Sequence, residues 1–335
     1  MISDYFRIDN NPKKGLMAVE WVVLAYMAVT LLIMQFTSTK IVNPHAMLWL
    51  RIRGVALIAA MWLVYKLIPC RFVLLLRVLV QMMSLAVWYP DTYELNRMFD
   101  NKDYLLAEWE QQLFGCQPAL LFAKAMPWHW FSELLDMGYF SYYPMIGLVA
   151  FFYMIFRYGE FERASFVIIA SFFIYYVIFI FFPTVGPTFY YNAVGTSDIA
   201  KGVFPHLGDY FSQHTDCLPA PGWQKGVFYN LVEDAKAAGE RPTAAFPSSH
   251  VGVSTIIMLL VWHTRNNKLL LVMLPFYIFL CLATVYIQAH YLIDAIAGFF
   301  SGILLYAVLM MLTRGMVPHE GRQLATAARK RRMGK

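Results

Sequence analysis

Two histidines and one aspartate of this chain lie where long apolar runs meet short polar stretches. His250 ends the stretch FPSSH (246–250), and the stretch HYLID (290–294) contains His290 and Asp294. An ionisable side chain at the edge of a membrane span is costly unless it has a partner, so it marks a candidate functional site. A histidine nucleophile, a carboxylate that orients it and a second histidine that donates a proton are the groups that phosphoryl transfer needs.

The spacing of His290 and Asp294 suits a catalytic pair. If the segment is helical, two residues four apart lie one turn apart on the same face. The carboxylate can then accept a hydrogen bond from one ring nitrogen, which leaves the other nitrogen unprotonated and nucleophilic. A buried pair that only stabilises the bundle is the alternative, and it would be preferred for an isolated pair. The neighbouring Pro-Ser-Ser-His motif favours catalysis.

Ser248 and Ser249 are placed to bind an anion. Pro247 suits the first turn of a helix, where its missing N–H costs nothing. The free N–H groups of that turn, the helix dipole and two hydroxyl groups would hold a phosphate beside His250. Without the second motif, a serine cap next to an interfacial histidine would explain the same residues. With it, we expect Ser248 and Ser249 to bind phosphate and His250 to donate a proton.

The composition predicts a membrane protein. Of the 335 residues, 59% are hydrophobic and only 14% are charged, whereas a soluble domain carries about 25% charged residues. Runs of about 20 apolar residues indicate membrane-spanning helices. The candidates are 19–37, 54–69, 72–89, 135–156, 164–182, 249–263, 269–287 and 291–312. The predicted fold class is all-α: a polytopic membrane helical bundle with about eight transmembrane helices.

The distribution of Lys and Arg predicts the orientation of the bundle. With the N-terminus in the cytoplasm, the inner loops and the C-terminal tail hold most basic residues, although Lys40, Arg51 and Arg53 would lie outside. We expect the basic cytoplasmic tail 313–335 to anchor this topology and to meet anionic lipid headgroups. Nucleic-acid binding is the less favoured interpretation of its run Arg329–Arg332. Both histidines then lie on the face opposite the tail.

Two long segments are expected on that same outer face. Segment 90–134 is rich in aromatic residues, which suits amphipathic helices in the headgroup region. Segment 183–248 is rich in Pro and Gly, as in a lid or a binding loop. Cys116 and Cys217 fall in different outer segments, so they could form a disulfide in an oxidising compartment or remain thiols.

The two motifs together resemble the second and third signature motifs of the type 2 phosphatidic acid phosphatase (PAP2) superfamily. Pro-Ser-Ser-His is followed about 40 residues later by His-x-x-x-Asp. The resemblance implies that His290 attacks phosphorus to form a phosphohistidine, that Asp294 orients it and that His250 protonates the leaving group. It implies no metal and no other cofactor. A PAP2-like catalytic core would span 135–312, after N-terminal helices and an interfacial segment at 1–134.

The sequence departs from the phosphatase branch of that superfamily in its basic residues. That branch has a first motif KxxxxxxRP well upstream of the second. Here Arg241-Pro242 lies only a few residues before the second motif, and Asp234 occupies the lysine position. Where the branch has Ser-Arg before the third-motif histidine, this chain has Ala283 and Thr284. Arg241 is the basic residue that remains beside the second motif, and we expect it to contact phosphate.

Other segments resemble the lipid phosphotransferase branch, which includes sphingomyelin synthases and inositol phosphorylceramide synthases. These segments are 138–144, 182–187 and 283–286. The overall likeness is to bacterial inositol phosphorylceramide synthases, and it is strong over about 180–312. It implies transfer of phosphoinositol from phosphatidylinositol to ceramide with release of diacylglycerol. It also implies a bacterial inner membrane with the active site on the periplasmic side.

Two other function classes remain open on the sequence. A lipid phosphate phosphatase would use the same three residues with water as acceptor, so the motifs do not separate it from a transferase. A transporter would place polar residues near the membrane midplane, often between internal repeats, and the sequence shows neither. The expected partners are membrane lipids and not nucleic acid. No ligand pair has the spacing of a zinc site, and the sequence does not define an oligomeric state.

Overall fold

A computed structural model describes residues 3–9, 12–37, 39–239 and 241–316 of the chain. Within these residues the regular structure is helical, apart from one isolated bridge between Ile8 and Cys70. The all-α fold class predicted from the sequence is therefore confirmed. The basic run Arg329–Arg332 lies outside the described residues, so its role stays a prediction.

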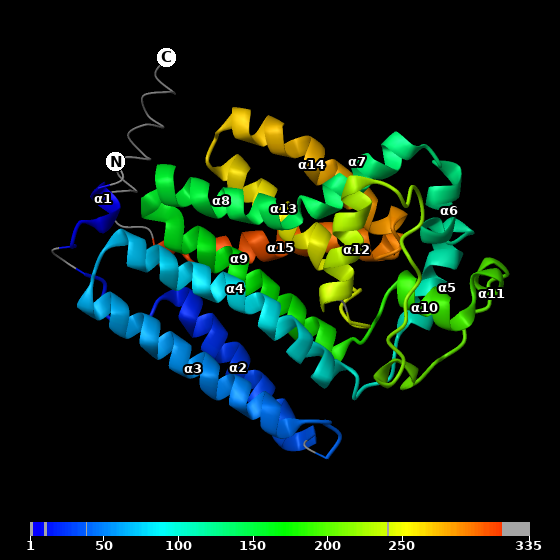
Figure 1. Cartoon of the computed structure of the whole chain (residues 1–335), viewed down its shortest axis with the longest axis horizontal. Coiled ribbons are helices and arrows are strands. Elements are labelled where there is room, and N and C mark those ends of the chain that lie inside the picture. The colour runs from blue at the N-terminus through cyan, green and yellow to red at the C-terminus, as the bar shows by residue number, and fades with distance from the viewer. Residues whose placement is uncertain (1–2, 10–11, 38, 240, 317–335) are drawn as a thin grey trace.

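Long helices lie side by side and form the body of the molecule (Figure 1). They are α2 (Ala18–Thr37), α3 (Pro44–Leu67), α4 (Arg71–Asn96), α8 (Tyr142–Phe156), α9 (Tyr158–Phe181), α13 (Ser249–His263), α14 (Asn267–Tyr286) and α15 (Leu292–Leu312). Helices α2, α3, α4, α9, α14 and α15 are long and apolar enough to cross a membrane. Helix α9 is the most buried of these six and packs against α2, α4, α8, α13 and α15. This is the architecture of an integral membrane protein.

Each predicted span coincides with helix in the structure, with two differences in form. The fourth span, 135–156, is a pair of helices, α7 (His129–Phe140) and α8, that meet at an angle of 45°. The sixth span is α13, whose 15 residues extend over about 22 Å. That is less than the roughly 30 Å of a bilayer's hydrocarbon core. Helix α13 packs against both α14 and α15, so these longer helices hold it in the bundle.

Helix α3 begins at Pro44, before the predicted span 54–69, and therefore includes Arg51. Its guanidinium donates to both carboxylate oxygens of Asp91 on α4, at 2.9 Å and 2.8 Å, and both side chains are buried. Arg77 of α4 is likewise buried against Glu20 of α2, at 2.8 Å and 2.5 Å. Both arginines are buried in ion pairs and are not exposed in loops. The count of basic loop residues that predicted the orientation therefore loses one residue on the outer side, Arg51, and one on the inner side, Arg77. The orientation of the bundle stays a prediction.

The two long segments predicted to share one face meet at one end of the bundle (Figure 1). Their elements are α5 (Asp103–Phe114), α6 (Pro118–Ala125), α10 (Pro187–Val194), α11 (Thr196–Ala200), the 3-10 turn η1 (Tyr210–Ser212) and α12 (Val227–Gly239). We call these elements the end cap. An apolar core within it joins Leu106 and Tyr190 to Tyr291, just before α15. The short helix α1 (Ser3–Phe6) lies at the other end, and the 3-10 turn η2 (Arg314–Met316) follows α15.

Candidate active site

His290 lies in the short loop between α14 and α15. Helix α14 ends at Tyr286, and Gln288 has a φ of 63°, in the left-handed region, which turns the chain away from the helix. The backbone N–H of His290 donates to the carbonyl of Thr284 at 2.9 Å, and the histidine side chain is buried. Only Asp294 is helical, so the condition under which the two residues would share one helical face is not met.

The ring of His290 is oriented by the backbone carbonyl of Ala245, whose oxygen lies 2.9 Å from Nδ1. A carbonyl only accepts hydrogen bonds, so Nδ1 carries the hydrogen and Nε2 keeps a lone pair. Oδ2 of Asp294 lies 3.6 Å from Nδ1, which is beyond hydrogen-bond distance. The hydrogen bond expected from Asp294 is thus made by Ala245 instead. The chemical consequence is the same, because Nε2 remains unprotonated and keeps the lone pair that a nucleophile needs.

Asp294 holds the backbone on both sides of the site. Its Oδ2 accepts the N–H of Tyr291 at 2.9 Å, which caps the start of α15. Its own carbonyl accepts the N–H of Ser248 at 3.0 Å, which ties the start of α13 to α15. Asp294 is fully buried, so its carboxylate, when ionised, would stabilise a positive charge on the His290 ring from a distance of 3.6 Å.

His250 faces His290 from the first turn of α13. The two ring centroids are 5.7 Å apart, and the ring planes meet at 63°. Ser248 is the N-cap of this helix. The N–H groups of Ser249 and His250 follow the cap and have no preceding helical carbonyl to bond, which is the arrangement of an anion site. The structure thus brings His250, His290 and Asp294 together, with Ser248 and Ser249 beside them.

Two tyrosines that the sequence analysis did not assign to the site enclose the ring of His250. Tyr139 stacks on it at 4.8 Å and 24°, and Tyr142 contacts it at 4.5 Å and 42°. Tyr139 belongs to the end of α7 and Tyr142 to the start of α8, so the bend between these helices places both rings against the histidine. The aromatic stretch 138–144 is the sequence signal that could have revealed them.

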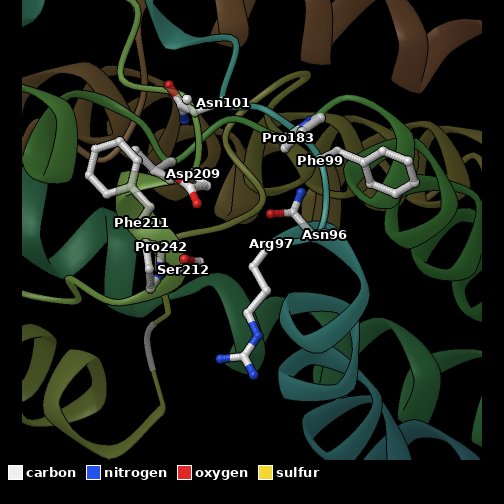
Figure 2. A pocket seen from close by; sticks show the side chains of 11 residues that line it. Asn96, Arg97, Phe99, Asn101, Pro183, Asp209, Phe211, Ser212 and Pro242 are labelled. Atoms are coloured by element: carbon white, nitrogen blue, oxygen red, sulfur yellow. The ribbon is translucent and has the colours of Figure 1, made fainter. Parts of the chain in front are cut away.

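Arg241 is exposed on the loop before α13. Its neighbour Pro242 lines a pocket at the end of α4, together with Asn96, Arg97 and Asp209 (Figure 2). The residues that line this pocket include neither His250 nor His290. The phosphate contact expected for Arg241 therefore stays a prediction.

The surroundings of His290 keep its ring neutral. Burial lowers the pKa of His290, and the nearby His250 lowers it further, to about 3, against the opposing hydrogen bond to Ala245. The ring is therefore unprotonated at neutral pH, as a nucleophile must be.

In the described parts of the chain, no three His, Cys, Asp or Glu side chains are grouped as ligands for a metal ion. Cys116 remains a thiol, so the disulfide with Cys217 is not formed within the described residues.

A family model described as the PAP2 superfamily matches residues 104–308. The match covers more than half of the chain and includes both histidines. The chain belongs to the PAP2 superfamily. No curated protein and no solved structure matches it. In this PAP2 protein the matched region begins in α5 and ends in α15, so it contains the end cap as well as the helices beside the histidines. The superfamily includes both phosphatases and phosphotransferases.

Proposed function

We propose that this PAP2 protein is a lipid phosphotransferase that moves phosphoinositol from phosphatidylinositol to ceramide and releases diacylglycerol. The pair of imidazoles carries the proposal. Nε2 of His290 keeps a lone pair because Nδ1 donates to Ala245, and His250 faces it with 5.7 Å between ring centroids. A phosphate held at these rings would meet a nucleophile and a proton donor. The choice of branch rests on the sequence resemblance and on the charges near the site.

Those charges favour a phosphodiester donor. Ala283 and Thr284 stand where the phosphatase branch has Ser-Arg, and both are buried at the end of α14. The hydroxyl of Thr284 donates to the carbonyl of Cys281 at 2.8 Å. A phosphate monoester can carry two negative charges and a diester carries one, so a diester needs fewer cations. Phosphatidylinositol is a diester.

In the first half-reaction, Nε2 of His290 attacks the phosphorus of phosphatidylinositol. The P–N bond forms while the P–O bond to diacylglycerol breaks, and His250 gives its proton to the departing alkoxide. The N–H groups at the start of α13 would stabilise the phosphoryl oxygens. Asp294 would balance the positive charge that develops on the His290 ring.

In the second half-reaction, His250 is neutral and accepts the proton of the ceramide hydroxyl. The ceramide oxygen attacks phosphorus and the P–N bond breaks. This step returns His290 to its neutral form and His250 to its protonated form, so the enzyme is unchanged after one turnover.

A transferase must also keep water away from the phosphohistidine. His290 is only 3% exposed, and Tyr139 and Tyr142 lie against His250. We propose that these rings and the end cap exclude water, so that a lipid hydroxyl becomes the acceptor. The location we propose is the periplasmic face of a bacterial inner membrane.

The test supplies purified protein with phosphatidylinositol and ceramide, and separately with phosphatidic acid. We expect inositol phosphorylceramide and diacylglycerol in equal amounts from the first mixture, and slow phosphate release from the second. The His290→Ala variant is the control for contaminating enzymes. Fast phosphate release from phosphatidic acid, with no inositol lipid formed from the first mixture, would show that the protein is a phosphatase.

A further inference from the structure

Helix α5 of the end cap carries a buried carboxylate that reaches the start of α15. Glu110 is fully buried, and its Oε1 accepts the N–H groups of Leu292 at 2.6 Å and Ile293 at 3.4 Å. These are the first two residues of α15 and follow His290 almost directly. A carboxylate is favourable there because the first N–H groups of a helix lack helical partners and the helix dipole is positive at that end.

A second buried carboxylate lies two turns earlier on the same helix. Oδ2 of Asp103 accepts the N–H of Val185 at 2.7 Å, and Oδ1 accepts the N–H of Gly186 at 2.8 Å. Two turns of helix therefore place Asp103 and Glu110 on one face of α5. Asp103 is directed at the loop before α10, and Glu110 at the first turn of α15.

The loop that Asp103 holds leads to the ring of His290. Thr184 precedes Val185, and its carbonyl accepts the N–H of Ala245 at 3.2 Å. The Thr184 hydroxyl also accepts the N–H of the next residue, Phe246, at 2.8 Å. The carbonyl of Ala245 then accepts the Nδ1 hydrogen of His290. A continuous path of hydrogen bonds through Thr184 and Ala245 thus runs from Asp103 to the nucleophile.

We infer that Asp103 and Glu110 are positioning residues for the nucleophile, and that α5 fixes His290 from two sides. Asp103 sets the carbonyl that orients the ring, and Glu110 sets the backbone that follows the histidine. The inference rests on the proposed function only in taking His290 as the nucleophile. Neither the acceptor lipid nor the headgroup enters it.

The surroundings of the two carboxylates agree with this role. Asp103 accepts hydrogen bonds from the N–H groups of Val185 and Gly186 and from the amide of Asn101. Glu110 accepts those of the first two N–H groups of α15. Burying a carboxylate away from water is costly unless such donors compensate. Oε2 of Glu110 is buried and makes no hydrogen bond within the described residues. Glu110 therefore holds the α15 backbone through one oxygen, which an amide oxygen could replace.

The test compares Glu110→Ala, Glu110→Gln and Glu110→Asp with Glu108→Ala, a matched control on the exposed face of the same helix. Cleavage of phosphatidylinositol is measured with and without ceramide, so that both hydrolysis and transfer are detected. Misplacing a reacting group by about 1 Å costs on the order of 100-fold in rate. We expect kcat of Glu110→Ala to fall by that order with KM little changed, because substrate contacts remain. Glu110→Gln should recover most of kcat, and Glu108→Ala should match the wild type.

A second readout does not depend on activity. Hydrogen–deuterium exchange at the amides of Leu292 and Ile293 should be slow in the wild type and in Glu108→Ala, and faster in Glu110→Ala. If Glu110→Ala does not fold, Glu110→Asp takes its place, because it keeps the charge but shortens the reach.

The inference would be overturned if Glu110→Ala showed the kcat and the hydrogen–deuterium exchange of the wild type. The same holds for Glu110→Asp if that variant has to replace Glu110→Ala. Equal loss of kcat in Glu110→Ala and Glu110→Gln would also overturn it, since a hydrogen-bond acceptor would not suffice. If the wild type turns over no lipid phosphate at all, the proposed function fails. Faster exchange in the variant would then still support the positioning of the α15 backbone by Glu110.

Discussion

The carbonyl oxygen of Ala245 lies 2.9 Å from Nδ1 of His290, closer than Oδ2 of Asp294 at 3.6 Å. The ring of His290, the proposed nucleophile, is thus oriented by the loop that leads into α13, the helix whose first turn carries His250. Asp294 completes the connection, because its carbonyl accepts the N–H of Ser248 at the start of that helix. The two histidines therefore share one backbone framework, and a displacement of that loop would misplace both.

Replacement of Asp294 should cost less than replacement of His290. His290→Ala removes the atom that bonds to phosphorus, so turnover should disappear. In Asp294→Asn the amide oxygen can still accept the N–H of Tyr291, and Ala245 still orients the ring, so only the stabilising charge is lost. We expect kcat to fall on the order of 10- to 100-fold, as for other residues that support a reacting group. Steady-state kinetics of both variants measure this, and equal loss in both would show that Asp294 acts directly in the chemistry.

Removal of the aromatic ring at Tyr142 should weaken the positioning of His250. An aromatic pair contributes about 0.5–1.5 kcal/mol, which corresponds to roughly a two- to tenfold fall in rate when the contact is lost. We expect that fall for Tyr142→Ala and a smaller effect for Tyr142→Phe, because the Tyr142 hydroxyl only reaches the carbonyl of Ser249 at 3.5 Å. Equal rates for the two variants would show that the ring does not matter.

The burial of Glu110 predicts a pH dependence of stability. Burial raises the pKa of Glu110 from 4.5 to about 7, against the lowering effect of the N–H groups of Leu292 and Ile293. Between these two pH values the folded protein binds more protons than the unfolded chain. The contribution of Glu110 to the stability of the folded protein therefore falls as the pH rises from 4.5 to about 7.

Glu110→Gln lacks this ionisation, so the difference in Tm between the variant and the wild type should grow in favour of the variant from pH 4.5 to 7. Thermal unfolding in detergent at several pH values measures it, with Glu108→Gln as the control. A difference that stays constant across the window would contradict the raised pKa.

The predicted orientation places the end cap outside and the tail inside. In a variant whose native cysteines are replaced, a cysteine at Lys201, directly after α11 of the end cap, should react with a membrane-impermeant reagent in intact cells. A cysteine at Lys268, exposed at the start of α14, should react only after the membrane is opened. Reaction of Lys268→Cys alone in intact cells would reverse the topology and place the active site in the cytoplasm.

Hydropathy was enough to predict the helices, and motif spacing was enough to pick out two histidines that the fold brings together. Long apolar runs leave few alternatives to membrane helices, because backbone polar groups must be satisfied within each segment. The start of α3 could not be predicted in this way. Arg51 looks like a loop charge until Asp91, which lies far along the chain, is known to neutralise it.

The contacts that orient the site were not accessible from the sequence. Ala245 contributes a backbone carbonyl, which any residue could supply, so no residue type reveals it. Glu110 has the charge of a surface residue, and its burial depends on the N–H groups of α15, which exist only in the folded chain. Tyr139 and Tyr142 reach His250 because the chain bends between α7 and α8.

The central claim is that His290 carries the phosphoryl group between the two lipids. The most direct measurement mixes the enzyme with phosphatidylinositol labelled at phosphorus, first without ceramide. We predict an acid-labile label on the protein that maps to His290, that is absent from His290→Ala, and that moves to inositol phosphorylceramide when ceramide is added. Formation of inositol phosphorylceramide with no label on the protein at any time would contradict the account.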